Sequence, residues 1–225
     1  MYYDWTFGLI IIAIIISAWA QIKVSSTYSK YSKVMAQNGM TASDVARLIL
    51  DSNNLQDVPV ERVAGNLTDH YDPRTRVLRL SDTVYNSSSV AAIGVAAHEV
   101  GHAIQDEHEY APLKVRGALV PLVSFSSSAS WVLIILGIFL SSLGMIQFGI
   151  LLFSAVVVFQ LVTLPVEFNA SSRALVALEG GGFLNRDEVE QSRKVLSAAA
   201  MTYVAAALAS ILQLIRLLAI FGHRD

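Results

Sequence analysis

The chain has 225 residues, of which 54% are hydrophobic and 15% are charged, with a formal net charge of −2. Soluble domains carry nearer about 25% charged residues, and disordered chains combine low hydrophobicity with high charge, so the composition disfavours both classes. The small net charge gives no indication of nucleic-acid binding. Because the chain has no cysteine, disulfide scaffolds, thiol nucleophiles and cysteine metal sites are excluded. Any metal ion must be bound by histidine and carboxylate side chains.

The hydrophobic residues are concentrated in four segments, each long enough to cross a bilayer core as a helix. They comprise residues 5–22, 117–143, 146–166 and 196–221. The first lies too near the N-terminus and lacks the preceding basic residues of a cleaved signal peptide, so we expect a permanent anchor. A turn at Gly144–Met145 would make the second and third a helical hairpin. Arg216, within the fourth, must reach an interface or face the helix bundle.

The basic residues predict how the chain is oriented in the membrane. Ten of the 16 lie between the first and second spans, whereas the N-terminal sequence MYYD has none. The positive-inside rule therefore places the N-terminus outside and the first polar segment in the cytoplasm. The hairpin then returns the second polar segment to the cytoplasm. We predict a multi-pass plasma-membrane protein with five parts: anchor 1–22, cytoplasmic domain 23–116, hairpin 117–166, cytoplasmic segment 167–195 and final helix with tail 196–225.

The cytoplasmic domain is expected to begin with two helices. They should span residues 28–38 and 41–52, the second with Thr41 or Ser43 as its N-cap. Residues 57–65 are expected to be extended.

A turn, a strand and a third helix follow. The turn is expected at Asp72–Pro73, and the alternating residues Arg76–Leu80 predict a strand. Residues 86–89 supply cap residues for a helix that runs to about Gln105. The predicted fold class is a mainly α membrane protein with about four transmembrane helices and a small β element in its cytoplasmic domain.

The third helix contains the sequence AAHEVGHAI, in which His98, Glu99 and His102 form an HExxH motif. Residues four apart lie on one helix face, so the two imidazoles can bind one tetrahedral metal ion. Glu99 can take a proton from a water molecule on that ion and pass it to a leaving amine. Zinc, a Lewis acid without redox chemistry, is the expected metal. The motif strongly favours this interpretation over two structural histidines and a surface glutamate.

A catalytic zinc ion usually has a third protein ligand and one open position. Glu167 follows Pro165 at the cytoplasmic end of the third span, on the same predicted side of the membrane as His98. It is therefore the first candidate for the third ligand, and Glu179 and His108 are the alternatives.

Four neighbouring features have more than one interpretation. The strand Arg76–Leu80 precedes the motif. In zinc peptidases with an HExxH motif, an edge strand at this place can hold an extended substrate by backbone pairing. His70 could assist the transition state. Arg173 could bind a carboxylate or an oxyanion, although contact of its guanidinium group with lipid headgroups is the favoured reading. Tyr203 could donate to an oxyanion, but a structural role is favoured.

Three stretches carry a resemblance to a known family. AAHEVGHAIQ, the upstream DHYDPRTRVLRLS and the downstream LPVEFNASSRAL resemble the YugP-like neutral zinc metallopeptidases of bacterial membranes, over nearly the whole chain. The family is more distantly similar to HtpX/Ste24-like peptidases. The resemblance implies a gluzincin-like site with His98, His102 and Glu167 as zinc ligands and Glu99 as general base.

Asn169 departs from this pattern, because related sequences tend to carry aspartate at this position. An aspartate there would orient a zinc-binding histidine and raise its basicity. Asn169 would then do this more weakly, or Asp69 or Asp72 would do it instead. Since the three ligands and the base are intact, the departure does not predict an inactive protein.

The leading hypothesis is a membrane-embedded zinc endopeptidase that hydrolyses peptide bonds of membrane or membrane-associated proteins through a zinc-bound water activated by Glu99. An intramembrane protease is disfavoured, because the apolar run 90–100 is too short to span a bilayer and acidic residues follow it. A zinc-stabilised adaptor without enzymatic activity is the remaining alternative. The hydrophobic hairpin could contact a substrate, a second copy of the chain or another membrane protein.

Overall fold

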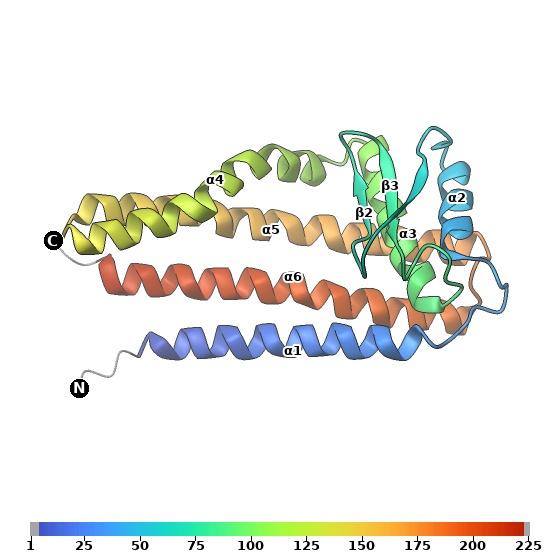
Figure 1. Ribbon diagram of the computed structural model, residues 1–225, viewed down its shortest axis with the longest axis horizontal. Coiled ribbons are helices and arrows are strands. Elements are labelled where there is room, and N and C mark those ends of the chain that lie inside the picture. The colour runs from blue at the N-terminus through green and yellow to red at the C-terminus, as the bar shows by residue number, and fades with distance from the viewer. Residues whose placement is uncertain (1–4, 223–225) are drawn as a thin grey trace. The chain divides into compact units, whose positions relative to one another are not determined.

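The computed structural model describes residues 5–222. The N-terminal MYYD and the tail 223–225, on which the predicted orientation partly depends, lie outside this range. The described chain forms helices α1 (Phe7–Tyr31), α2 (Ala42–Ser52), α3 (Val90–Glu107), α4 (Ala111–Phe139), α5 (Leu143–Gly180) and α6 (Arg186–Phe221) (Figure 1). Its strands are β1 (Val60–Val63), β2 (His70–Asp72) and β3 (Val77–Ser81). The fold is thus mainly α with a small sheet, as predicted.

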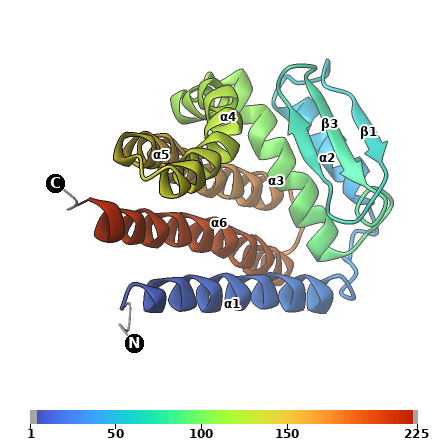
Figure 2. The same ribbon diagram turned by 60° about the vertical axis from the view of Figure 1, so that its left-hand side comes forward.

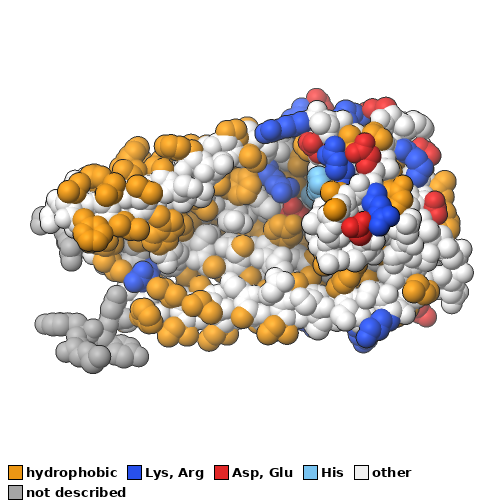
Figure 3. Space-filling model, viewed as in Figure 1, with side chains coloured by type: hydrophobic (Ala, Val, Ile, Leu, Met, Phe, Trp, Pro, Cys, Tyr) orange, Lys and Arg blue, Asp and Glu red, His pale blue; other side chains and the backbone are white. Residues whose placement is uncertain are grey.

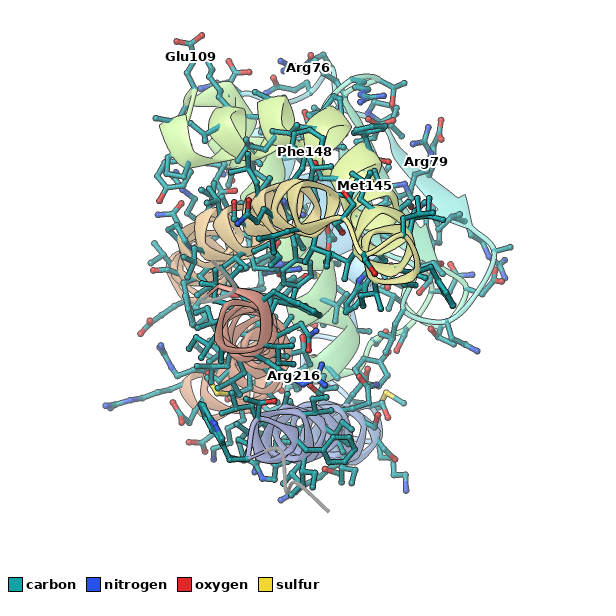
Figure 4. The ribbon with its side chains drawn as sticks, turned by 90° about the vertical axis from the view of Figure 1, so that its left-hand side faces the viewer. Arg76, Arg79, Glu109, Met145, Phe148 and Arg216 are labelled. Atoms are coloured by element: carbon teal, nitrogen blue, oxygen red, sulfur yellow. The ribbon has the colours of Figure 1, made fainter. Side chains whose placement is uncertain are left out.

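Four of these helices, α1, α4, α5 and α6, are long and apolar enough to cross a membrane. They correspond to the four predicted spans, and the prediction of a mainly α membrane protein is confirmed. The predicted position of the hairpin turn is wrong, however. The chain turns at residues 140–142, where Ser141 has a left-handed φ of 50°. Gly144 and Met145 instead lie inside α5 (Figure 4).

The chain divides into two compact units. Within the described range, the membrane unit is made of residues 5–21, 114–165 and 201–222, and the polar unit of Ile22–Leu113 and Val166–Ala200. Helix α5 therefore contributes its first part to the membrane unit and its last part, which includes Glu167, to the polar unit.

The membrane unit has a small core and a large apolar surface, part of which is visible in Figure 3. Among the described residues, its main buried cluster consists of six side chains: Ile134, Ile146, Ile150, Phe153, Val157 and Leu217. Helices α4 and α5 approach closely at Gly149, where an added Cβ would lie 2.8 Å from the carbonyl oxygen of Ser130. Large side chains such as Phe139 point outwards and are 81% exposed. Outward apolar side chains suit a helix surrounded by lipid.

The polar unit contains a three-stranded sheet in the order β1–β3–β2 (Figure 2). Strand β3 pairs parallel to β1 and antiparallel to β2. The strand predicted at Arg76–Leu80 is therefore central, and the expectation that it forms an edge is wrong. The edge nearest α3 is β2, for which the sequence predicted no strand. Leu78 and Leu80 of β3 are fully buried.

Helix α2 begins as the sequence predicts. Thr41 is its N-cap, and its side chain and that of Asp44 form a reciprocal capping box. Val45, Ile49 and Leu50 are fully or almost fully buried in the core of the polar unit, and each contributes about 1.5–3 kcal/mol to folding. The helix predicted at residues 28–38 is only partly correct. The helical part belongs to α1, which ends at Tyr31. Residues 32–38 are irregular, and Met35 among them forms an isolated antiparallel bridge with Ser89.

Candidate metal centre

Helix α3 carries the HExxH motif through the middle of the polar unit. Its N-cap is Ser89, whose side chain accepts a hydrogen bond from the backbone N–H of Ala92, as the cap residues predict. Small residues dominate the helix, and thirteen of its residues are buried. At Gly94 an added Cβ would overlap the hydroxyl of Ser192 on α6. The small side chains therefore let neighbouring helices approach the motif.

Gly101 brings α5 to the metal-binding face of α3. An added Cβ at this position would lie only 2.5 Å from the carbonyl oxygen of Ala170. Because the obstacle is backbone, a larger residue could be accommodated only by moving a helix. Ala170 follows Glu167 by three residues, so the close approach fixes this part of α5 beside the two histidines.

The three predicted ligands converge in the folded chain. The Nε2 atoms of His98 and His102 lie 3.2 Å and 3.7 Å from the same carboxylate oxygen, Oε2 of Glu167. One ligand atom from each residue lies within 4.8 Å of the others. Glu167 is only 2% exposed and His102 only 9%. A carboxylate and two imidazoles are thus held together in a nearly closed site.

The separations of Glu167 from the two histidines fit a tetrahedral metal ion. Zinc binds imidazole nitrogen and carboxylate oxygen at about 2.0–2.2 Å, so two such ligands are separated by about 3.4 Å. The observed separations of 3.2 Å and 3.7 Å bracket this value. The donor set of two nitrogens and one oxygen also suits zinc, and it leaves one tetrahedral position for water or substrate.

Glu99 directly follows His98 on α3 and contacts the sheet. Its Oε2 accepts a hydrogen bond of 3.1 Å from the backbone N–H of Tyr71 in β2. Burial raises the pKa of its carboxyl group, while the nearby His98 and His102 oppose this rise. A carboxylate with a raised pKa is a better proton acceptor near neutral pH.

The pKa of His102 is also raised, but by different causes. Burial alone would lower its pKa, but the hydrogen bond to Glu167 and the negative charges of Glu99 and Glu167 raise it above the usual value. Without a metal ion the site therefore favours a proton on His102. A metal ion must displace that proton, because only a neutral imidazole is a ligand.

Two further side chains support the histidines, and the sequence analysis missed both roles. Ser171 Oγ lies 3.1 Å from His98 Nδ1, and Gln105 Oε1 lies 3.0 Å from His102 Nδ1. Both spacings were available as signals, because Ser171 is four residues after Glu167 and Gln105 three after His102. Such contacts orient metal-binding imidazoles and affect metal affinity.

The alternative third ligands lie outside this cluster. His108, the C-cap of α3, contacts a guanidinium nitrogen of Arg173 through its Nδ1 at 3.2 Å. Glu179 is exposed near the end of α5. His70 is also exposed, and its Nδ1 contacts the carbonyl oxygen of Thr68. Tyr203 lies in a part of α6 that belongs to the membrane unit.

Three polar residues near the site differ from expectation. Asp69 accepts hydrogen bonds from the backbone and hydroxyl of Ser81, and Asp72 caps the turn before β3. Neither aspartate contacts a motif histidine. The suggestion that Asp69 or Asp72 orients a histidine in place of an aspartate at position 169 is therefore wrong. Asn169 is linked to His102 only through Gln105, because its Oδ1 accepts hydrogen bonds from Gln105 and Arg173. The guanidinium group of Arg173 thus contacts Asn169 and His108 within the polar unit.

Comparisons with known proteins agree with this geometry. Residues 6–222 match the family described as "Putative neutral zinc metallopeptidase". The chain is 54% identical over 213 residues to the "Putative membrane protease YugP" of Bacillus subtilis strain 168, a match that covers 95% of each sequence. No solved structure matches. The family match covers nearly the whole chain, including both parts of the site. The chain therefore belongs to this family of membrane zinc metallopeptidases.

Proposed function

We propose that the protein is a membrane-embedded zinc endopeptidase in which His98, His102 and Glu167 hold the metal ion and Glu99 is the general base. The observation that carries this proposal is the convergence of both Nε2 atoms on one oxygen of Glu167, with Glu99 on the adjacent position of α3. The match to a zinc metallopeptidase family supports the same chemistry.

The roles of the residues follow from their surroundings. Zinc, when bound, supplies positive charge that polarises a peptide carbonyl and acidifies water. Glu99 accepts the proton of the attacking water and then donates it to the departing amine. The amide of Tyr71, which donates to Glu99 Oε2, orients the carboxylate for this transfer. His98, His102 and Glu167 remain in place, held by the packing of α3 against α5.

Strand β2 is the part of the sheet best placed to receive an extended substrate. Its residues pair with β3 on one side, and the N–H of Tyr71 points to Glu99 on the other. A polypeptide that adds to this edge would run past the general base. Substrates are accordingly polypeptides bound in an extended form, and the four apolar helices favour membrane or membrane-associated proteins.

The polar unit, and with it the active site, faces the cytoplasm in this proposal, because most basic residues lie in it. Helix α3 carries Glu99, Asp106 and Glu107 and is not among the described helices apolar enough to cross a membrane. These acidic residues support a site in water rather than in the bilayer.

The absence of cysteine allows a direct test of orientation with single-cysteine variants. Ser52 at the end of α2 and Ser141 in the α4–α5 turn are both exposed. A membrane-impermeant maleimide should label Ser141→Cys in intact cells and Ser52→Cys only after lysis. Labelling of Ser52→Cys in intact cells would reverse the proposed orientation.

The enzymatic proposal is tested with Glu99→Gln. This variant keeps the three ligands, so the purified protein should retain zinc, but it cannot accept a proton and should lose cleavage of a casein-type or membrane-protein substrate. A chelator should abolish cleavage by the parent protein. Retained cleavage by Glu99→Gln would overturn the base assignment. Zinc binding without cleavage of any substrate by the parent would instead favour the adaptor role.

A further inference from the structure

Gln105 is an unusual residue in the core of the polar unit, because it is polar and completely buried. It lies on α3 three residues after His102. Its Oε1 faces His102 Nδ1 at 3.0 Å, and its Nε2 donates to the carbonyl oxygen of Val166 at 2.8 Å and to Asn169 Oδ1 at 3.0 Å. The oxygen and both N–H groups of this buried amide therefore have partners, and these hydrogen bonds connect α3 to α5.

The orientation of each amide in this set follows from Arg173. A guanidinium group can only donate, so the Asn169 atom that lies 2.8 Å from Arg173 Nε must be the carbonyl oxygen Oδ1. The same oxygen faces Gln105, so the Gln105 atom beside it must be the donor, Nε2. The carbonyl oxygen of Val166 requires the same assignment. Oε1 of Gln105 is then left to face His102.

This orientation determines which nitrogen of His102 carries a proton. Gln105 Oε1 can only accept, so Nδ1 of His102 must be the donor. The other nitrogen, Nε2, faces Glu167 Oε2, and it is the nitrogen that would bind a metal ion in place of a proton. His98 differs in this respect. Its Nδ1 faces the hydroxyl of Ser171, which can donate or accept and therefore selects no tautomer.

We propose that Gln105 is the positioning residue for His102, and that Asn169 and Arg173 fix the orientation of Gln105. The proposal rests on the proposed function in so far as His102 is a zinc ligand. It also explains why asparagine is sufficient at position 169. The side chain there needs an oxygen that accepts from both Gln105 and Arg173, and either an amide or a carboxylate provides one.

The test is the zinc affinity of the full-length protein in detergent, measured by competition with a chelator. Gln105→Leu removes the acceptor for His102 and should weaken zinc binding about 10–100-fold, the usual effect of losing such a partner. Gln191→Leu is the matched control. It removes another glutamine of the polar unit, whose Oε1 has no hydrogen-bond partner among the described residues, and zinc affinity should be unchanged.

A pair of substitutions at Asn169 separates orientation from packing. Asn169→Asp keeps an oxygen that accepts both hydrogen bonds, so its zinc affinity should stay close to that of the parent. Asn169→Leu removes the acceptor and should weaken zinc binding, though less than Gln105→Leu. Equal affinities of the two variants would overturn the proposal. This pair also decides the question if Gln105→Leu fails to fold.

A spectroscopic signature completes the test. With ¹⁵N-labelled histidine, the zinc-loaded parent should show a hydrogen-bonded Nδ1–H resonance for His102, and Gln105→Leu should displace it while that of His98 stays. If Gln105→Leu leaves zinc affinity and this resonance unchanged in a parent that binds zinc, the proposal fails but the proposed function stands. If the parent binds no zinc, the proposed function itself fails.

Discussion

Most of the exposed large apolar side chains lie in the membrane unit, whereas the polar unit buries most of its own. Ile14 of α1 and Phe139 of α4 are 61% and 81% exposed, whereas Leu50 of α2 and Leu78 of β3 are fully buried. Lipid tails are as apolar as these side chains, so a helix in the bilayer has no reason to hide them. In water their burial is the main driving force for folding.

Polar side chains show a second difference between the two units. In the membrane unit, Thr163 bonds to the carbonyl of Phe159 one turn back in its own helix. In the polar unit, Gln105 and Glu99 bond to residues on other elements. The first pattern only satisfies a hydroxyl group, whereas the second fixes side chains from α3, α5 and β2 relative to one another. Such cross-connected polar groups are what a metal centre requires.

The largest expected effect comes from removing a ligand in the polar unit. Loss of a hydrogen bond that supports a ligand usually weakens metal binding about 10–100-fold. Glu167→Ala removes a ligand itself, so it should reduce zinc affinity by more than this, and proteolysis should be lost with it. Zinc content after purification is the measurement. Glu179→Ala is the control on the same helix, because Glu179 is exposed and should not matter. The opposite pattern would make Glu179 the third ligand.

The contrast between the units predicts opposite responses to the same kind of substitution. Ile14→Lys puts a charge on a lipid-facing position of α1, which costs about 2.5–3.5 kcal/mol of membrane insertion. Leu48→Lys on α2 replaces a residue that is 43% exposed and should cost little. The amount of full-length protein in the membrane fraction measures both. Equal tolerance of the two variants would mean that α1 does not face lipid.

A smaller effect is expected from the close helix approach beside the metal centre. Gly101→Ala places a Cβ 2.5 Å from the carbonyl oxygen of Ala170, which should cost about 1–3 kcal/mol of stability and weaken zinc binding. Gly117→Ala in α4 meets nothing within 4 Å and should be neutral or slightly stabilising. Thermal unfolding in detergent compares them. An unaffected Gly101→Ala would show that α3 and α5 are not closely packed.

The mildest effect is that of pH on zinc binding. The pKa of His102 is raised in the metal-free site by Glu167 and Glu99, which outweigh burial. A raised pKa means that the proton competes with zinc at higher pH than for an ordinary histidine. Zinc affinity should therefore be full above this pKa and fall below it by about tenfold per pH unit for one competing proton. A pH-independent affinity in chelator competition would contradict this prediction.

Much of this architecture could be predicted from local sequence. Four long apolar runs, the Thr41 and Ser89 caps and the HExxH spacing each depend on residues close together in the chain, and all appear in the structure. The sheet could not be predicted so well. Strand β2 has three residues with one buried side chain, too short for an alternating pattern, so the position of β3 between two partners could not be known.

The supporting residues of the site were missed for a related reason. Ser171 and Gln105 are ordinary polar residues of helices, and their roles arise only because Gly101 lets α5 approach α3. Asn169 shows the same limit. Its sequence position suggested direct contact with a histidine, whereas in the folded chain Gln105 lies between them. Contacts between distant segments decided these assignments.

The central claim is that His98, His102 and Glu167 hold a zinc ion beside Glu99. An experimental structure of the zinc-loaded protein, with the metal identified by its X-ray absorption edge, tests it most directly. The account predicts metal–ligand distances of about 2.0–2.2 Å to Nε2 of both histidines and to a carboxylate oxygen of Glu167. Zinc bound to the two histidines with His108, Glu179 or another residue in place of Glu167 would contradict it.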